Sequence, residues 1–423
     1  MNFQIISLGC PKNLVESEYM TYRLEEAGHI TAEDCDVIII NTCAFIADAA
    51  RESINTILSW AGRGDKKKLI VTGCLVERYK EQLKALLPEV DIFVGRGCYP
   101  EIERLIDKKG FFYKKAIFSD AYPRRIFTQR PTAYLKIMDG CNNMCSYCTV
   151  PFIRGHLKSR GIDGIEKEFH WLIANGYREI NIIGQDIASY GKDIGSSLKD
   201  LLRHFLNIKG DYFLRLLYLH PLHIDNDILE IVKNEERIIK YLDIPIQHSE
   251  DRILNMMNRG YTKAYISFLL ERIKERIPDC VLRTTLIVGF PGETEEEFHR
   301  LCEFIKKWRF DNLGAFMYSR EEGTPAYRLK GHLRKNIKEQ RLREIMEIQQ
   351  GISKMNLKRL EGRESLVIVE EKDATGITGR LLTQSPDIDG IAFIKGQCYP
   401  GEIRGCKIVK TLDYDVIVSI KDC

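Results

Sequence analysis

Short apolar segments alternate with amphipathic helical patterns in two separate runs, and this alternation restricts the fold more than any other feature of the sequence. Such alternation predicts parallel sheets whose faces are covered by helices. The second run contains six strand–helix units, which predicts a partial barrel, related to the eight-unit barrel but open on one side. The expected strands are residues 3–8, 37–40, 69–71 and 92–94 in the first run, and residues 134–138, 179–183, 213–217, 241–244, 281–288 and 313–316 in the second.

The pattern changes after these runs. A long charged helix is expected over residues 334–360, and short β runs with glycine and aspartate turns follow it, which predicts a small antiparallel barrel. Residues 111–130 are aromatic and basic, contain Pro123, and are expected to form a linker. The fold class is therefore α/β, with an N-terminal parallel-sheet domain, a central partial barrel and a C-terminal barrel. The expected limits are residues 1–118, a linker at 119–130, then 131–360 and 361–423.

Composition excludes several classes of protein. The chain has 423 residues, 44% of them hydrophobic, and 63 basic residues nearly balance 60 acidic ones. This balance gives no strong attraction to nucleic acid or to acidic membranes. The N-terminal residues do not resemble a signal peptide, and no apolar run has the length of a membrane span. We therefore expect a cytoplasmic protein with no membrane partner.

Cysteine is unusually frequent, with thirteen residues, and three of them lie in one short loop. Cytosolic thiols stay reduced, so metal ligation is a better explanation than disulfides. Cys141, Cys145 and Cys148 have the spacing CxxxCxxC, and thiolates favour iron–sulfur clusters or zinc. A zinc site needs a fourth ligand, for which His156 is the only nearby candidate. Three cysteines would instead leave one iron of a four-iron cluster open to bind a substrate or cofactor.

Three further cysteines share a position relative to the expected strands. Cys10, Cys43 and Cys74 each lie two or three residues beyond the end of a strand in the first run. In a parallel sheet these strand ends lie at one edge, where ligands bind. Packing of small residues in strand–helix turns is the alternative explanation, but it predicts no such common position. A second metal site is therefore expected here.

The CxxxCxxC loop at the start of a six-unit barrel closely resembles the radical S-adenosylmethionine (SAM) superfamily. The resemblance implies that SAM binds the open iron and is cleaved to a radical that removes hydrogen from a carbon. It also implies cofactor contacts at barrel strand ends, although each of these residues could equally be a loop or capping group. The expected contacts are Gln185, Asp186, Gln247, Gly289 and Glu293. His248, next to Gln247, is a candidate of the same kind, whereas His220 and His223 are expected to pack in a loop rather than to bind a ligand.

Two three-cysteine sites, followed by a small barrel like a TRAM domain, resemble the methylthiotransferase family over essentially the whole chain. The resemblance implies two 4Fe-4S clusters, with Cys10, Cys43 and Cys74 holding the auxiliary cluster that supplies or carries sulfur. A further SAM would provide the methyl group. No general acid or base is evident. The remaining cysteines receive no role: Cys35, Cys98, Cys280, Cys302, Cys398, Cys406 and Cys423.

Two substrate classes are known in this family: a prenylated adenosine of tRNA, and an aspartate of a small-subunit ribosomal protein. The motifs at residues 7–13, 41–46, 73–78 and 318–324 resemble the ribosomal-protein branch, whereas Asn142-Asn143 resembles the tRNA branch. From residue 362 onward eight basic residues face ten acidic ones, and a domain that grips tRNA should be clearly basic. We therefore favour methylthiolation of the aspartate β-carbon.

Two alternatives remain open. The chain could modify prenylated tRNA, or it could be an iron–sulfur or zinc protein that only binds RNA or ribosomes through its last domain. The second explains the small barrel but not the polar strand ends around the cysteine loop. The favoured reaction also requires an electron donor, whose identity the sequence does not give.

Overall fold

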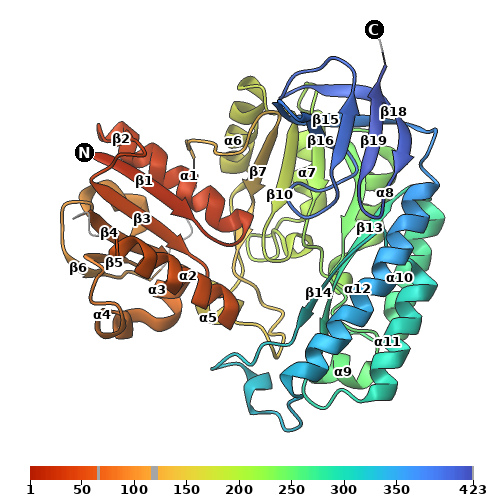
Figure 1. Ribbon diagram of the computed structural model, residues 1–423, viewed down its shortest axis with the longest axis horizontal. Helices are drawn as coiled ribbons and strands as arrows, with labels where there is room; N and C mark the ends of the chain where they lie inside the picture. The colour runs from red at the N-terminus through yellow and green to blue at the C-terminus, as the bar shows by residue number, and fades with distance from the viewer. Residues whose placement is uncertain (64–66, 116–121, 422–423) are drawn as a thin grey trace.

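The N-terminal domain is built on a six-stranded parallel sheet with the strand order β2-β1-β3-β4-β5-β6 (Figure 1). The computed structural model describes residues 1–63, 67–115 and 122–421. All six residues of the central strand β3 are buried, because α1 packs on one face of the sheet and α2 on the other. The strands are β1 (Asn2–Ser7), β2 (Ile30–Thr31), β3 (Val37–Thr42), β4 (Lys68–Gly73), β5 (Ile92–Val94) and β6 (Gly110–Phe112), and the helices are α1 (Pro11–Glu26), α2 (Ala47–Ala61), α3 (Cys74–Tyr79) and α4 (Leu83–Leu86).

The four strands expected in this domain are confirmed, but two edge strands were not predicted. β2 and β6 have only two and three residues, which are too few to show an alternating pattern. β6 also begins the stretch 111–130, so the prediction that this whole stretch is a linker is wrong. Residues 122–130 form no helix or strand, and residues 119–121 of the expected linker lie outside the described residues. The domain limits themselves stay predictions.

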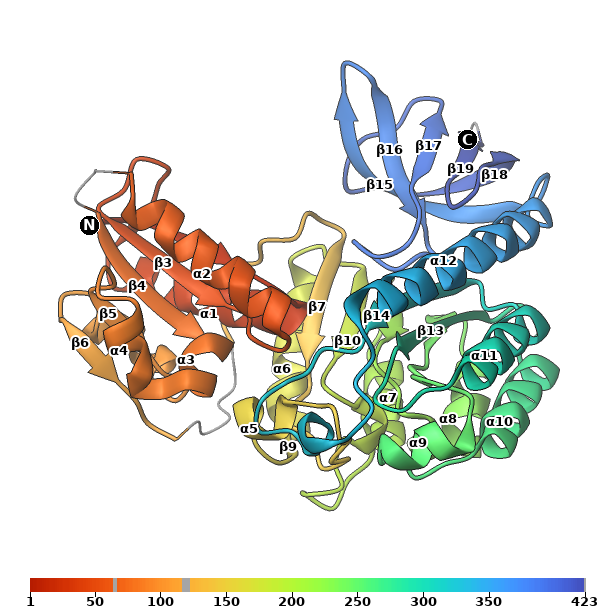
Figure 2. The same cartoon turned by 60° about the horizontal axis from the view of Figure 1, so that its bottom comes forward.

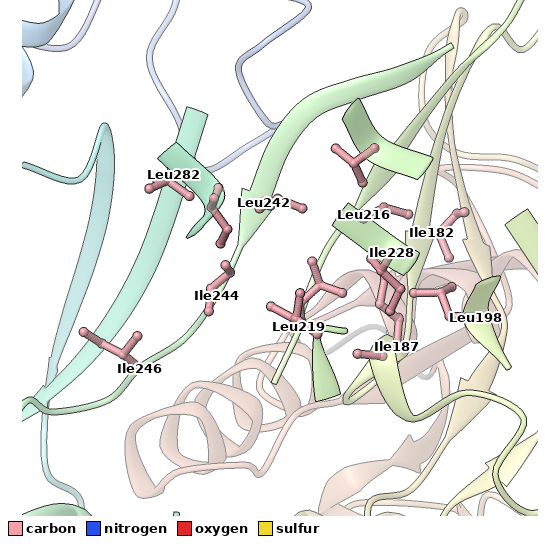
Figure 3. Packing of buried hydrophobic residues seen from close by; sticks show 14 of the residues in the cluster. Ile182, Ile187, Leu198, Leu216, Leu219, Ile228, Leu242, Ile244, Ile246 and Leu282 are labelled. Carbon is pink, nitrogen blue, oxygen red and sulfur yellow. The ribbon is translucent and has the colours of Figure 1, made fainter. Parts of the chain in front are cut away.

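The central domain is the predicted partial barrel. Its six parallel strands have the order β14-β13-β12-β11-β10-β7, and β14 and β7 do not pair with each other. Apolar side chains of β10 to β13, such as Leu216 and Leu242, pack together and face the surrounding helices (Figure 3). The strands are β7 (Thr132–Lys136), β10 (Glu179–Ile183), β11 (Phe213–Leu216), β12 (Ile238–Asp243), β13 (Val281–Val288) and β14 (Asn312–Met317), with a short pair formed by β8 (Met138–Asp139) and β9 (Lys158–Ser159).

Helices cover the outside of this partial barrel. The expected long helix is α12, which packs on α11 and β14 and contacts the C-terminal domain through β18 (Figure 2). None of the described helices combines the length and the apolar character needed to cross a membrane. The helices are α5 (Val150–Arg154), α6 (Ile162–Ala174), α7 (Leu198–Asn207), α8 (Asn226–Asn234), α9 (Asp251–Met256), α10 (Lys263–Arg276), α11 (Glu295–Trp308) and α12 (Lys335–Lys358).

The C-terminal domain is a closed five-stranded barrel with the order β15-β16-β17-β19-β18. The expectation of a purely antiparallel barrel is wrong for one pair, since β17 and β19 are parallel. The reason is topological: β18 pairs with β15, and β19 then returns antiparallel to β18 and fills the space beside β17. The strands are β15 (Glu364–Asp373), β16 (Gly376–Leu381), β17 (Ala392–Lys395), β18 (Ile403–Thr411) and β19 (Val416–Ile420).

A buried ion cluster fastens the C-terminal barrel to the central domain. Glu179 at the start of β10 pairs with Arg215 of β11 and with Arg380 of β16, and all three side chains are at most 3% exposed. Burial alone would raise the pKa of Glu179, but the two guanidinium groups lower it to about 2. The carboxylate is therefore ionised at neutral pH, and its charge depends on both arginines.

Replacement of Arg380 by alanine should destabilise the protein by about 3 kcal/mol, because it leaves a buried carboxylate short of one partner. The measurement is chemical denaturation of wild type and variant. The control is Lys395→Ala, an exposed position in the same barrel, which should change stability by less than about 0.5 kcal/mol. Equal losses of stability in the two variants would show that the ion cluster contributes little to the stability of the protein.

Candidate active site

The three-cysteine loop follows β8 at the carboxyl-end edge of the barrel and leads into α5. Its path depends on Gly140, which has φ +71° and lies so close to His156 that a side chain would collide with the backbone oxygen. The N–H of Cys148 donates to the carbonyl of Cys145 (3.0 Å), which closes the turn. Local geometry therefore holds the three cysteines in one compact loop.

The electrostatics of the loop indicate that its thiols lie close together and need a cation. Burial is the main cause, and the charge of Cys145 a further one, of a pKa raised to about 11 at Cys141 and to about 12 at Cys148. Arg259 donates a hydrogen bond to Cys145 Sγ (3.2 Å) and is the cationic side chain in contact with that thiol. Three thiolates in this setting fit a metal centre, whose positive charge would stabilise them.

A cavity of about 250 Å³ opens beside this loop. Cys141, Asn143 and Asp186 line it. Asp186 accepts hydrogen bonds from Asn143 Nδ2 (2.9 Å) and from His223 Nδ1 (2.6 Å). Burial acts to raise the pKa of Asp186, but the histidine outweighs it and lowers that pKa. An ionised aspartate thus ties the cysteine loop to the end of β10.

Gln185 has an unsatisfied oxygen. Its Nε2 donates to Asp139 Oδ1 (2.8 Å), whereas its Oε1 is buried and finds no hydrogen-bond partner among the described residues. A buried acceptor without a donor is costly unless a ligand supplies one. Gln185 is therefore a position where the amine of a bound cofactor would fit.

The other expected cofactor contacts have identifiable structural roles. The backbone of Gln247, with φ +65°, pairs with β13 through Thr285 and Ile287. Glu293 accepts hydrogen bonds from the N–H groups of Gly289 (2.8 Å) and Phe290 (3.1 Å), and its other oxygen pairs with Arg341. The Glu293 carboxylate therefore shapes its own loop with both oxygens.

The second set of cysteines meets at the edge of the N-terminal sheet. Cys10 precedes α1, Cys43 follows β3, and Cys74 is the first residue of α3. A methyl group added at Gly9 would lie 2.8 Å from Cys43 Sγ, which shows how closely the first two segments approach. Burial, together with the charges of Cys74 and Cys10, raises the pKa of Cys43 to about 11.

The two cysteine sets face each other across the junction between the domains. Thr149, next to Cys148, donates from Oγ1 to the carbonyl of Phe45 (2.8 Å), two residues after Cys43. Arg154 of α5 lies 3.6 Å from Cys74 Sγ. The sheet edge that carries Cys43 and Cys74 and the segment that follows the cysteine loop are therefore in direct contact at this junction.

A buried ion network stabilises this junction. Arg154 Nη1 lies 2.9 Å from Glu16 Oε1 and 3.1 Å from Asp139 Oδ1. Arg96 contacts the same two carboxylates, and Lys136 lies 2.7 Å from Glu16. These side chains are nearly inaccessible to solvent, so the network holds the N-terminal domain rigidly against the barrel.

Comparison with known proteins identifies the family. Residues 2–95 match an uncharacterized protein family, UPF0004; residues 135–305 match the radical SAM superfamily; and residues 362–420 match the TRAM domain. The ribosomal protein uS12 methylthiotransferase RimO of Geobacter sulfurreducens is 44% identical to this chain, with 98% of each covered. That of Thermotoga maritima is 39% identical, with 99% of this chain and 100% of the relative covered. This chain belongs to the RimO family of methylthiotransferases.

Membership of the radical SAM superfamily makes this RimO-family chain an enzyme that uses SAM and an iron–sulfur cluster. The radical SAM methyltransferase TsrM of Kitasatospora setae has a similar fold, with a TM-score of 0.55 over 77% of this chain and 76% of its own. At 14% identity that likeness concerns the fold alone. The central barrel, the first feature inferred from the sequence, is thus common to both proteins.

Several residues of this RimO-family site were not found from the sequence. Glu16, Arg96, Asp139 and Arg154 carried no motif, because their contacts connect segments 15 to 138 residues apart. His223 was assigned to loop packing, but it is hydrogen-bonded to Asp186 in the cavity. The only signal for it was its position near the end of a barrel strand.

Proposed function

We propose that this enzyme adds a methylthio group to the β-carbon of an aspartate in ribosomal protein uS12. The observation that carries the proposal is the arrangement of two three-cysteine sets that face one junction, in a chain whose relatives are named uS12 methylthiotransferases. A reaction that joins sulfur to carbon needs both sources within reach of one substrate atom, and this junction supplies that proximity.

The cysteine loop is proposed to hold the cluster that acts on SAM, with Cys141, Cys145 and Cys148 as ligands. When bound, this cluster supplies the electron that cleaves SAM and so generates the hydrogen-abstracting radical. Arg259 donates to Cys145, and Asp186 fixes Asn143 of the loop. These contacts orient the ligands before iron arrives.

The set Cys10, Cys43 and Cys74 is proposed to hold a second 4Fe-4S cluster, which supplies or carries the sulfur. Arg154 supports this assignment, since its guanidinium lies beside Cys74 and compensates negative charge on the ligands. Burial acts to raise the pKa of Cys10, but Lys12 and Arg154 outweigh it and lower that pKa. The residues present therefore favour a thiolate at Cys10, whereas burial raises the pKa of Cys43 and Cys74, whose thiolates would need the positive charge of a metal centre.

The cavity beside Cys141 is proposed to bind SAM. Asp186 forms part of its wall, and Gln185, the residue before it in the chain, has an unsatisfied oxygen. Gln247, Gly289 and Glu293 would shape the cavity through the backbone and loop contacts described above. These assignments stay predictions until SAM binding is measured.

The protein substrate is favoured over tRNA by two observations. The C-terminal barrel is slightly acidic, which suits a basic ribosomal protein better than phosphates. Asn142 and Asn143, the tRNA-like feature, serve the loop itself: Asn142 Oδ1 accepts from the N–H of Leu157 (3.1 Å), and Asn143 binds Asp186. We place the reaction in the cytoplasm, with an external electron donor.

Incubation of the anaerobically reconstituted enzyme with SAM, a reductant and each candidate substrate tests the proposal. We expect a methylthio mass gain on one aspartate of uS12 and none on prenylated tRNA. A gain on tRNA alone would reject the proposed substrate. SAM cleavage without either product would retain the radical enzyme and reject both substrates.

A further inference from the structure

Lys12 differs from the other cations of the domain junction. Arg96, Lys136 and Arg154 are all paired with Glu16 and Asp139. No carboxylate of the described residues lies within 4.0 Å of Lys12 Nζ. Its contacts are the carbonyl of Gly184 at 3.3 Å and the ring of Tyr218, whose centroid is 3.7 Å away.

These contacts place the Lys12 ammonium at the barrel mouth, although Lys12 belongs to the N-terminal domain. Gly184 directly follows β10, and Tyr218 lies two residues beyond β11. Both strands end at the edge where barrel active sites are built. Lys12 is also two residues from Cys10, in the first turn of α1. The ammonium therefore lies between the proposed sulfur-supplying site, to which Cys10 belongs, and the barrel mouth, where SAM is proposed to bind.

An ammonium has three N–H donors. The carbonyl of Gly184 accepts a hydrogen bond from one N–H group, and a second N–H group faces the Tyr218 ring. One donor is left for a ligand. Because Lys12 is half-buried, a carboxylate that reaches it would form a partly desolvated, charge-assisted pair, which is stronger than an exposed one.

We propose that Lys12 binds the side-chain carboxylate of the substrate aspartate and so positions its β-carbon between the two cysteine sets. This inference rests on the proposed function. The reacting carbon is bonded directly to the carboxylate carbon, about 1.5 Å away, so anchoring the carboxylate fixes the position of the carbon. Lys12 is thus a residue that distinguishes aspartate from uncharged side chains of the same shape.

The test compares uS12 with a uS12 variant whose target aspartate is replaced by asparagine. Binding of each labelled protein to the reconstituted enzyme is measured by fluorescence anisotropy, and product formation is measured by mass. We expect wild type to bind the aspartate form more tightly by about tenfold or more. Lys12→Met, which keeps the length of the side chain without its charge, should bind both forms alike. Lys12→Arg should keep the preference.

Iron content is determined for every variant, and Lys108→Met serves as a matched control, because Lys108 lies over the Phe112 ring at an exposed position. If Lys12→Met loses iron, the aspartate preference of Lys12→Arg is compared with that of the uncharged variant Lys12→Gln instead. An unchanged aspartate preference in the uncharged variant, or no preference in wild type, would overturn the role of Lys12 alone. No binding and no methylthio product with wild type would overturn the proposed function, and this inference with it.

Discussion

Replacement of Cys145 by alanine should abolish SAM cleavage, with a rate reduced by more than about a hundredfold. Mutation of a residue that only contacts a metal ligand typically costs about 10- to 100-fold, so loss of a ligand itself should cost more. Cys145 is the most buried of the three loop thiols and accepts the hydrogen bond from Arg259. Without it, the loop keeps two thiols, and Arg259 loses one hydrogen-bond acceptor while it keeps those of Tyr261 and Pro245. The measurement is release of the SAM cleavage products under anaerobic reducing conditions.

Iron content separates this effect from misfolding. The variant should retain roughly half of the wild-type iron, because Cys10, Cys43 and Cys74 belong to a different domain. Cys302→Ala is the matched control, since Cys302 is also buried in the central domain but lies in α11, away from the site. SAM cleavage at the wild-type rate in Cys145→Ala would reject the assignment of the loop.

Replacement of Cys43 by alanine should have the opposite pattern: SAM is still cleaved, but no methylthio product forms. Cys43 lies beyond β3, its backbone is hydrogen-bonded to the Ser53 hydroxyl, and it does not line the cavity beside Cys141. Loss of the second site should therefore leave the SAM site intact and remove the sulfur. The two readouts are SAM cleavage and the mass of uS12 from the same reaction.

The matched control for this change is Cys98→Ala, because Cys98 is buried in the same domain but is not one of the three proposed ligands. It should form product at nearly the wild-type level. Product formation by Cys43→Ala would show that sulfur does not come from this set. Loss of SAM cleavage in Cys43→Ala would instead show that the two sites depend on each other.

Much of the fold could be predicted, because periodic patterns are local. β3 and β13 show their strand character in six and eight consecutive residues. The short edge strands β2 and β6 lack that length, and they exist because neighbouring strands offer free backbone groups. The parallel pairing of β17 with β19 depends on the order of strands in space, which no local pattern encodes.

The same distinction between local patterns and long-range contacts applies to the site. The loop cysteines could be found from their spacing, and the second set from its common position after strands. The contacts of Arg154 with Glu16 and Cys74 could not, since they depend on how two separately folded domains pack. The cofactor contact expected of Glu293 stays a prediction. Its hydrogen bonds from the N–H groups of Gly289 and Phe290 also close the loop, a role that the sequence left equally open.

The different origins of the two cysteine sets have a consequence for maturation of the enzyme. The loop brings its thiols together within eight residues of chain, so little entropy is lost when they gather around iron, even on a nascent polypeptide. Cys10, Cys43 and Cys74 become neighbours only after β1, β3 and β4 have paired in register. Topology therefore sets an order of assembly for the two proposed sites: the loop cysteines can gather before folding is complete, whereas Cys10, Cys43 and Cys74 can do so only in a finished sheet.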